Sequence, residues 1–396
     1  MSGVVGPAGI LRRLLSGRFG ALLLPAIVLQ SVLIGGGYAT GREIVTYGGR
    51  FGAHGWLAVV AIFVGFSLLA MLTFEVARVF AAYEYKGFIR QLIGPLWPAF
   101  DLLFGVMAVL VIAVMASAAA NILHDTLGLS MLAGTGAIVV AVAVLTYFGA
   151  AVIEAFKSVG SALLYGAYLV FGVLVLNGRW ERVVEVFARG DVSAAPEAGP
   201  GGAFAAGVLY VGYNLVVFPA VLFTLHRQTT RRETLWAGLI AGFLMTAPFA
   251  LTYLCLLAFY PSAEVLDAPV PWLPMLRQVG GGGLLVLFGV VMGWTLLETS
   301  VGLIHALLDR IDRNRRRRLT RLQSVLLGVG VLLLAALLSR VGIIALVARG
   351  YSFMGYLLIA LFALPLLTVG TFRILKPQWR PELRIGRRSP GGESRV

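Results

Sequence analysis

Long uncharged stretches recur along this chain, and they restrict its fold more than any other feature. Residues 56–74 and 102–123 contain no charged side chain, and each stretch is long enough to cross about 30 Å of hydrocarbon as a helix. Of the 396 residues, 59% are hydrophobic and 13% are charged, whereas a soluble chain carries roughly 25% charged residues. The sequence therefore predicts an all-α, polytopic membrane protein and excludes a soluble enzyme and a disordered scaffold.

Ten apolar segments are candidate membrane spans. They are residues 20–47, 54–80, 98–123, 131–152, 158–177, 203–225, 234–259, 279–308, 322–339 and 351–372. Three arginines precede the first segment, as in a signal peptide, but no small-residue cleavage site follows it. We therefore expect the first segment to remain in the protein as a membrane helix.

The basic residues predict how these spans are oriented. The chain has 32 lysines and arginines and a net charge of +14, and most of these residues precede the first span, separate alternate spans or lie in the tail. The positive-inside rule then predicts a multi-pass protein of the cytoplasmic (inner) cell membrane with both termini in the cytoplasm. Because topology accounts for the basic residues, the expected partner is the lipid bilayer and not a nucleic acid. The arginine run at 315–318 is either an orientation signal or a site for anionic lipid.

The spans also predict the organisation of the chain. The expected parts are a cytoplasmic N-terminal segment (1–19), a first five-helix repeat (20–177), an external loop (178–202), a second, inverted five-helix repeat (203–372) and a basic cytoplasmic tail (373–396). The composition of the tail predicts that it is disordered. Residues 180–187 of the external loop alternate enough to form a short interfacial helix, and residues 261–280 suit a cap over an outer vestibule.

Helix-weakening residues occur at matching places in the two halves. Gly35, Gly36 and Gly37 lie in the middle of the first span, and each weakens a helix by roughly 1 kcal/mol relative to alanine. The sixth span contains Asn214 and then Pro219, which removes a backbone donor. Irregular backbone at this depth persists only where it is buried in protein or lines a cavity. The alternative is that these glycines serve close helix packing.

Each half of the chain contains five spans, and an odd number of spans places the two halves in the membrane in opposite orientations. The sequence therefore predicts a 5+5 inverted repeat in which helices 1 and 6 are broken. Discontinuous helices at corresponding positions are typical of secondary transporters with a binding site near the middle of the membrane.

The stretch from Gly35 to Glu43, Gly-Gly-Gly-Tyr-Ala-Thr-Gly-Arg-Glu, resembles the G-A-G-F-A-S-G-x-E signature of the YkvI-type bacterial membrane proteins. Tyr210, Tyr213 and Asn214 of the sixth span are also similar to that family. The family is assigned to the amino acid–polyamine–cation (APC) superfamily, so the resemblance implies a LeuT-like fold and a role in transport.

A helix that is broken in mid-membrane exposes unpaired N–H groups at one new end and unpaired carbonyl groups at the other. The first attract anions and the second attract cations. We therefore expect the amides of Gly35, Gly36 and Gly37 to hold the anionic group of a small polar solute, such as an amino acid, a related zwitterion or an organic acid. The sixth span would complete this pocket with Tyr210, Tyr213 and Asn214.

Two adjacent hydroxyls in the eighth span indicate a site for a coupling ion. Thr299 and Ser300 offer hard oxygen ligands, which suit a hard cation. The resemblance implies that these hydroxyls bind Na⁺ together with the backbone carbonyls of Ser31 and Ile34, as in LeuT-fold sodium symporters. The alternative is that each hydroxyl donates to a carbonyl of its own helix.

Acidic residues inside the membrane are functional candidates by default. Glu43 follows the glycine break and Glu298 lies in the eighth span, and both are candidates to carry a coupling proton. Pairing with Arg42 or with a helix end is the alternative role for Glu43. Glu75 and Arg78 are three residues apart, which predicts an ion pair at the cytoplasmic rim.

The sequence contains no enzyme motif. Its four histidines lack the spacing of metal ligands, and neither a P-loop nor a nucleophile elbow is present. We therefore expect no enzymatic activity, no cofactor and no metal other than Na⁺. The predicted function is Na⁺- or H⁺-coupled symport of a small-molecule solute by alternating access. A receptor built on a transporter fold, like the spore germinant receptors, is the alternative, and the oligomeric state is left open.

Overall fold

The computed structural model describes residues 17–35, 38, 40–148, 166–313 and 319–376, and within these ranges the chain forms helices and no β-strand. Seven of the described helices are long and apolar enough to cross a membrane, and three shorter apolar helices accompany them. These ten segments coincide with the ten predicted spans, although the fifth is described only over Gly166–Leu176. The prediction of an all-α, polytopic membrane protein is confirmed.

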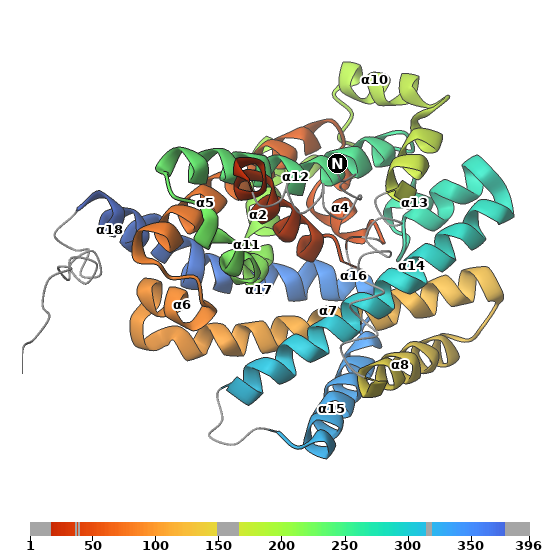
Figure 1. The fold of residues 1–396 in the computed structure, drawn as a ribbon. Coiled ribbons are helices and arrows are strands. Elements are labelled where there is room, and N and C mark those ends of the chain that lie inside the picture. Colours follow the sequence, from red (N-terminus) through yellow and green to blue (C-terminus); the bar gives the residue numbers. More distant parts are fainter. Residues whose placement is uncertain (1–16, 36–37, 39, 149–165, 314–318, 377–396) are drawn as a thin grey trace, which may run out of the picture.

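The elements follow one another as two sets of five spans (Figure 1). The first set contains α2 (Arg18–Leu33), α4 (Arg42–Tyr47), η1 (Gly49–Gly55), α5 (Trp56–Phe80), α6 (Tyr85–Ile93), α7 (Trp97–Leu127), α8 (Met131–Phe148) and the fifth span. The second contains α11 (Gly199–Asn214), η4 (Leu215–Arg227), α12 (Arg231–Leu257), α14 (Trp272–Arg313), α15 (Arg321–Ser339) and a tenth span from α16 (Ile343–Ala345) through α17 (Ser352–Leu358) to α18 (Thr371–Leu375). Outside the spans lie α10 (Trp180–Arg189) and α13 (Ala263–Leu266).

The first span is interrupted where the glycines predict it. Helix α2 ends at Leu33, and α4 begins only at Arg42. Ile34 has non-helical backbone angles, and Gly41 has a φ of 81°, a left-handed conformation that glycine adopts without strain. Gly36 and Gly37 lie outside the described residues. The prediction of a broken first helix is therefore confirmed at both ends of the break.

The sixth span changes its type of helix and does not unwind. The α-helix α11 ends at Asn214, and the chain continues directly as the 3₁₀ helix η4, which contains Pro219. A 3₁₀ helix has fewer residues per turn and poorer hydrogen-bond geometry than an α-helix. The interruption predicted at Asn214 is therefore present as a change from an α-helix to a 3₁₀ helix.

Helix packing has the symmetry of two repeats. Helices α2, α5, α11 and α12 form one group, and α7, α8, α14 and α15 form another (Figure 1). The first span packs on the seventh and the sixth on the second, while the third packs on the ninth and the eighth on the fourth. In a 5+5 repeat each span corresponds to the span five positions later. The pair of spans 1 and 7 therefore corresponds to the pair of spans 6 and 2, and the pair of spans 3 and 9 corresponds to the pair of spans 8 and 4. Helix α17 of the tenth span contacts both groups, through α11 and α7.

Small residues allow close approach within the first group. A Cβ added at Gly242 of α12 would lie 2.7 Å from the backbone nitrogen of Ser67, and one added at Gly238 would lie 2.6 Å from that of Met71. Both neighbours belong to α5. The close contact between α5 and α12 therefore requires glycine at these two positions, as is common where membrane helices pack closely.

The segments that the sequence predicts to be external agree with the prediction in part. The helix expected at 180–187 is present as α10. The eighth span, expected from 279, begins earlier because α14 starts at Trp272, whose side chain is fully buried, and bends at Gly281, where φ is 65°. The segment 261–280 is therefore a shorter connection than the expected cap. The arginines at 315–318 and the tail from 377 lie outside the described residues.

Candidate functional site

A buried carboxylate links the two interrupted spans. Glu43 lies in the first turn of α4, directly after the break in the first span, and only 6% of it is exposed. The Tyr213 hydroxyl, from the last turn of α11, donates a hydrogen bond of 2.5 Å to Glu43 Oε2. The two predicted breaks thus meet at one acid–phenol contact. The sequence predicts different roles for the two residues, proton coupling for Glu43 and solute binding for Tyr213.

Arg42 does not pair with its neighbour Glu43. Its buried guanidinium donates through Nη1 to the carbonyl oxygens of Leu266 and Ala268, at 2.7 and 3.1 Å. These carbonyls belong to α13 and the residues after it. Arg42 therefore holds α4 against the connection between the seventh and eighth spans, and no ion pair of Glu43 occurs among the described residues. The alternative of an Arg42–Glu43 pair is wrong.

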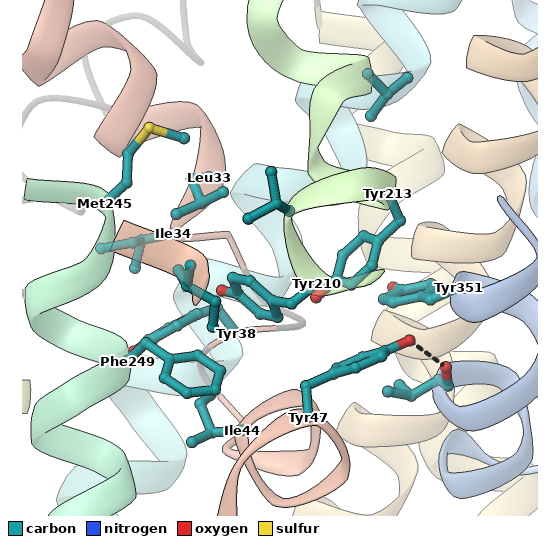
Figure 2. Close-up of a cluster of buried hydrophobic side chains, with 14 of the residues drawn as sticks. Leu33, Ile34, Tyr38, Ile44, Tyr47, Tyr210, Tyr213, Met245, Phe249 and Tyr351 are labelled. Carbon is teal, nitrogen blue, oxygen red and sulfur yellow. Dashed lines mark hydrogen bonds between the residues drawn. The ribbon is translucent and has the colours of Figure 1, made fainter. Parts of the chain in front are cut away.

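Four tyrosines, which we call the tyrosine cluster, surround this contact: Tyr47 of α4, Tyr210 and Tyr213 of α11, and Tyr351 of the tenth span. Figure 2 shows these side chains converging from three elements. The ring centroids of Tyr213 and Tyr351 are 4.9 Å apart, and those of Tyr213 and Tyr47 are 5.4 Å apart. All four residues are buried. Phe249 of α12 extends the cluster, with its centroid 4.8 Å from that of Tyr210.

The hydroxyls of the cluster differ in their partners. Tyr47 Oη donates to the carbonyl of Val347 at 3.1 Å and lies 3.1 Å from Ser352 Oγ. Within the part of the chain that the structure describes, the buried hydroxyls of Tyr210 and Tyr351 have no hydrogen-bond partner. Buried polar atoms are seldom left unpaired, so these two hydroxyls differ from those of Tyr47 and Tyr213, which are hydrogen-bonded.

The remaining residues of the predicted solute site occupy different surroundings. Asn214 donates from Nδ2 to the carbonyl of Tyr210, one turn earlier in α11, at 2.8 Å. Gly35 lies against the eighth span, since a Cβ added to it would be 3.0 Å from Thr299 Cγ2 and 3.2 Å from Thr299 Oγ1. Gly36 and Gly37 lie outside the described residues. The predicted solute site, with Gly35 and the three residues of α11, stays a prediction.

The predicted ion site is brought together in part. The contact between Gly35 and Thr299 places the eighth span beside the broken first span, as the resemblance implied. Ser300 is buried and donates to the carbonyl of Leu296 at 2.8 Å, while Ser31 donates to the carbonyl of Val28 at 2.9 Å. A hydroxyl that donates in this way keeps lone pairs for a cation. Binding of Na⁺ by these hydroxyls and the carbonyls of Ser31 and Ile34 therefore stays a prediction, as does proton transfer by half-buried Glu298.

Sequence reasoning missed two members of the tyrosine cluster. Tyr47 follows Glu43 by four residues, so the two share one face of a helix, and this spacing is a signal that was present in the sequence. Tyr351 reaches the cluster only through the packing of the tenth span against α11. No local pattern indicates such a contact.

A second feature lies outside the tyrosine cluster. An open pocket of about 670 Å³ is lined mainly by α10 and by the segment that follows α12: Gly178, Arg179, Glu181, Arg182, Glu185, Ala258, Phe259, Tyr260, Ser262 and Gln278. Two of its charged side chains pair with each other, because Arg182 Nη1 donates to Glu185 at 2.5 Å, and Arg182 Nη2 also donates to the Tyr260 carbonyl at 2.8 Å. The described residues contain no group of three or more His, Cys, Asp or Glu side chains that suits a metal ion.

The arrangement of these helices defines the class of fold, which is that of polytopic membrane transporters. The chain is similar in structure to a Na⁺-coupled sialic acid symporter, with a TM-score of 0.52 and 14% identity over 89% of this chain and 86% of the symporter. It is also similar to a mutant of the manganese transporter of Eremococcus coleocola, with a TM-score of 0.52 and 16% identity over 92% of this chain and 81% of the transporter. No protein-family model matches the sequence, and no curated protein matches it. At these identities the similarity shows the fold alone.

Proposed function

We propose that this protein is a secondary active transporter of a small polar solute, in the cell membrane, that works by alternating access around a site near the middle of the membrane. The single observation that carries the proposal is the buried contact between Glu43 and Tyr213, which joins the two interrupted spans. An ionisable residue within the membrane is costly and marks substrate or ion pathways. Interrupted helices at matching positions of two repeats mark the same place.

The finer identity of the protein rests on one signature. The stretch from Gly35 to Glu43 supports membership of the YkvI-type proteins and so of the APC superfamily. Two described residues of the stretch support this proposal, because Gly35 follows directly after the end of α2 and Glu43 contacts Tyr213. We therefore propose this family together with the transport function.

Of the two candidate coupling ions, Na⁺ and H⁺, we test Na⁺ first. Thr299 lies against the broken first span, and the similar sialic acid symporter is Na⁺-coupled. The measurement is the thermal stability of the purified protein in Na⁺ and in K⁺. A ligand at 100 times its Kd stabilises a protein by about 2.7 kcal/mol, so a Na⁺-specific rise in melting temperature is expected. The double variant Thr299→Ala, Ser300→Ala should lose that rise, while Thr295→Ala, one turn earlier in α14, should keep it.

A wild-type protein that Na⁺ does not stabilise would contradict sodium coupling. Proton coupling is then tested by measuring stability against pH in Glu43→Gln and Glu298→Gln. A pH dependence that is lost in one of these variants assigns the proton to that residue. A pH dependence that persists in both rejects these two acids as proton carriers.

The receptor function is the second candidate, because a buried site between interrupted helices can bind a small molecule without moving it. Net accumulation of a solute in proteoliposomes separates the two functions. A transporter concentrates the solute when a Na⁺ or pH gradient is imposed. Binding of the solute without accumulation under either gradient would favour the receptor.

A further inference from the structure

We propose that the exposed basic face of α6 binds the headgroup of an anionic phospholipid. This site, which we call the basic corner, consists of Lys86 and Arg90 of α6 together with Arg373 of α18. The proposal concerns an interaction with the membrane, and it does not depend on the proposed transport function. It adds a preferred class of lipid to the bilayer that is expected to surround the spans.

Helix α6 has an apolar face and a basic face. Phe88 and Leu92 are buried, and the ring of Phe88 packs on that of Phe362 in the tenth span, with the two centroids 6.2 Å apart. Lys86 and Arg90 are exposed, and their spacing of four residues places them on one side of the helix. Because the protein itself covers the apolar face, the basic face is the one that α6 presents to its surroundings.

Neither basic side chain of α6 has an acidic partner in the described part of the chain. The ion pairs of the described residues include neither Lys86 nor Arg90. The acidic residues nearest to α6 in the sequence are Glu84 and Asp101, and Asp101 pairs with Arg310 at 3.3 Å. The basic corner therefore has an excess of positive charge, which is complementary to a phosphodiester group.

A third positive charge comes from the end of the tenth span. Arg373 of α18 donates through Nη1 to the backbone carbonyl of Gln91 and to its side-chain Oε1, at 2.8 and 2.9 Å. Gln91 follows Arg90 directly, so the Arg373 guanidinium is held at the end of α6. Both bonds come from Nη1, and a guanidinium has further N–H donors that suit the oxygens of a phosphate group.

The basic corner adjoins the exposed apolar surface of the third span. Figure 1 shows α6 at the end of the bundle where α7 begins. Trp97 is the first residue of α7, and Lys86 Nζ lies 4.1 Å from the centre of its ring. Tryptophan is enriched where a span meets the headgroup region. Farther along α7, Leu102 and Val106 are 68% and 42% exposed, so acyl chains can lie along this helix below a headgroup at Lys86.

The neighbouring apolar surface decides between a lipid and a free phosphate. Positive charge alone would attract either of them, whereas exposed leucine and valine side chains next to the charge suit only a molecule with acyl chains. Basic groups beside membrane helices are known to bind anionic headgroups. Phosphatidylglycerol carries a net negative charge and phosphatidylcholine does not, so the basic corner should prefer phosphatidylglycerol.

The test is equilibrium binding of labelled phosphatidylglycerol to the purified, full-length protein in a neutral detergent. Phosphatidylcholine with the same acyl chains and inorganic phosphate are added as competitors, and both should compete poorly. The double variant Lys86→Gln, Arg90→Gln should weaken the apparent affinity for phosphatidylglycerol about 30-fold, the loss expected when two basic residues are removed from a membrane surface.

Two matched variants separate this site from a general effect of charge. Lys86→Arg, Arg90→Lys keeps both charges and should retain the affinity. Arg340→Gln, Arg349→Gln removes two exposed arginines on the opposite side of the predicted membrane, and it should leave the affinity unchanged. Raising the salt concentration from about 0.1 M to about 1 M should weaken binding to the wild type, because the Debye length falls from about 10 Å to about 3 Å.

Four results would overturn the proposal. Phosphatidylcholine that competes as well as unlabelled phosphatidylglycerol would show that the headgroup charge is not recognised, and inorganic phosphate that competes equally well would indicate a site for a free anion. Equal affinity in Lys86→Gln, Arg90→Gln and the wild type would exclude the basic corner. An equal loss in Arg340→Gln, Arg349→Gln would show that net charge alone attracts the lipid. Because the assay measures lipid binding only, a failure to accumulate any solute would refute transport and keep this site.

Discussion

Glu75 of α5 illustrates how a single buried side chain holds two spans together. It accepts hydrogen bonds from Arg78, at 2.7 and 2.9 Å, and from the Thr234 hydroxyl of α12, at 2.8 Å. The ion pair with Arg78 is the one that the spacing of the two residues predicts, so the pair is confirmed, and its place at the cytoplasmic rim stays a prediction. The contact with Thr234 adds a link between the second and seventh spans.

Thr234→Val should therefore destabilise the protein. Thr234 is fully buried, and a hydrogen bond to a charged group contributes about 1.5–3 kcal/mol. The change should appear as a lower melting temperature in detergent. Thr368→Val is the matched control, because the Thr368 hydroxyl is exposed and bonds only the Leu364 carbonyl of its own helix. Equal melting temperatures for Thr234→Val and the wild type would contradict this role.

Local spacing explains which residue contacts could be predicted from the sequence. Glu75 and Arg78 are close in the chain and on one helix, so their distance follows from helix geometry. The contact of Glu43 with Tyr213 joins residues in different halves of the chain, and their relative position depends on how the spans pack. The sequence singled out both residues but could not show that they touch.

Close helix packing gives a prediction at the scale of elements. Gly242→Ala should destabilise the protein by about 1–3 kcal/mol, the usual cost of overpacking, because the new Cβ would be 2.7 Å from the Ser67 nitrogen and 2.8 Å from its Cα. Backbone atoms of α5 cannot move aside as a flexible side chain can. Gly330→Ala in α15 is the control, since no atom lies within 4 Å of its new Cβ. A melting temperature that falls equally in both variants would contradict the packing argument.

Helix α10, outside the spans, gives a prediction about pH. Glu185 accepts hydrogen bonds from Arg182 at 2.5 Å, and it pairs with Arg189 at 2.7 Å. The hydrogen bond from Arg182 and the nearby arginine charges lower the pKa of Glu185 below its usual 4.5. Because the folded-state pKa is the lower one, this stabilisation is present above about pH 4.5 and is lost as the pH falls through the folded-state value.

The melting temperature of Glu185→Gln should accordingly depend less on pH than that of the wild type between pH 3 and 6. Glu181→Gln, on the same helix, serves as the control, since no ion pair of Glu181 occurs among the described residues. Parallel pH curves for the wild type and Glu185→Gln would show that the contacts of Glu185 do not stabilise the fold.

The interrupted elements show why part of the site was predictable. Consecutive glycines weaken a helix, so an interruption close to Gly35 was predictable, and α2 ends at Leu33. The sixth span was harder to predict, because the chain continues past Asn214 without a gap, as the 3₁₀ helix η4, which also contains Pro219. The early start of α14 at Trp272 reflects burial of that tryptophan, which depends on neighbours distant in sequence.

For the whole molecule, the number of spans could be predicted from hydrophobicity. Their arrangement into two groups of packed helices could be seen only in the structure.

The orientation of the protein in the membrane stays a prediction, and cysteine labelling tests it. The single cysteine, Cys255, is buried and is first replaced by serine. A membrane-impermeant maleimide should then label Glu181→Cys, on α10, in intact cells. It should label Glu84→Cys, between α5 and α6, only after the membrane is opened, and the reverse pattern would contradict cytoplasmic termini.

The central claim is that the contact between Glu43 and Tyr213 is the solute site of a secondary transporter, and gradient-driven accumulation tests it most directly. Proteoliposomes with equal amounts of wild-type protein, Glu43→Gln or the control Glu197→Gln are given labelled amino acids, amines and organic acids under an imposed Na⁺ or pH gradient. We predict that the wild type and Glu197→Gln concentrate at least one solute and that Glu43→Gln does not. Equal accumulation by Glu43→Gln and the wild type, or accumulation of no solute by the wild type under either gradient, would contradict the claim.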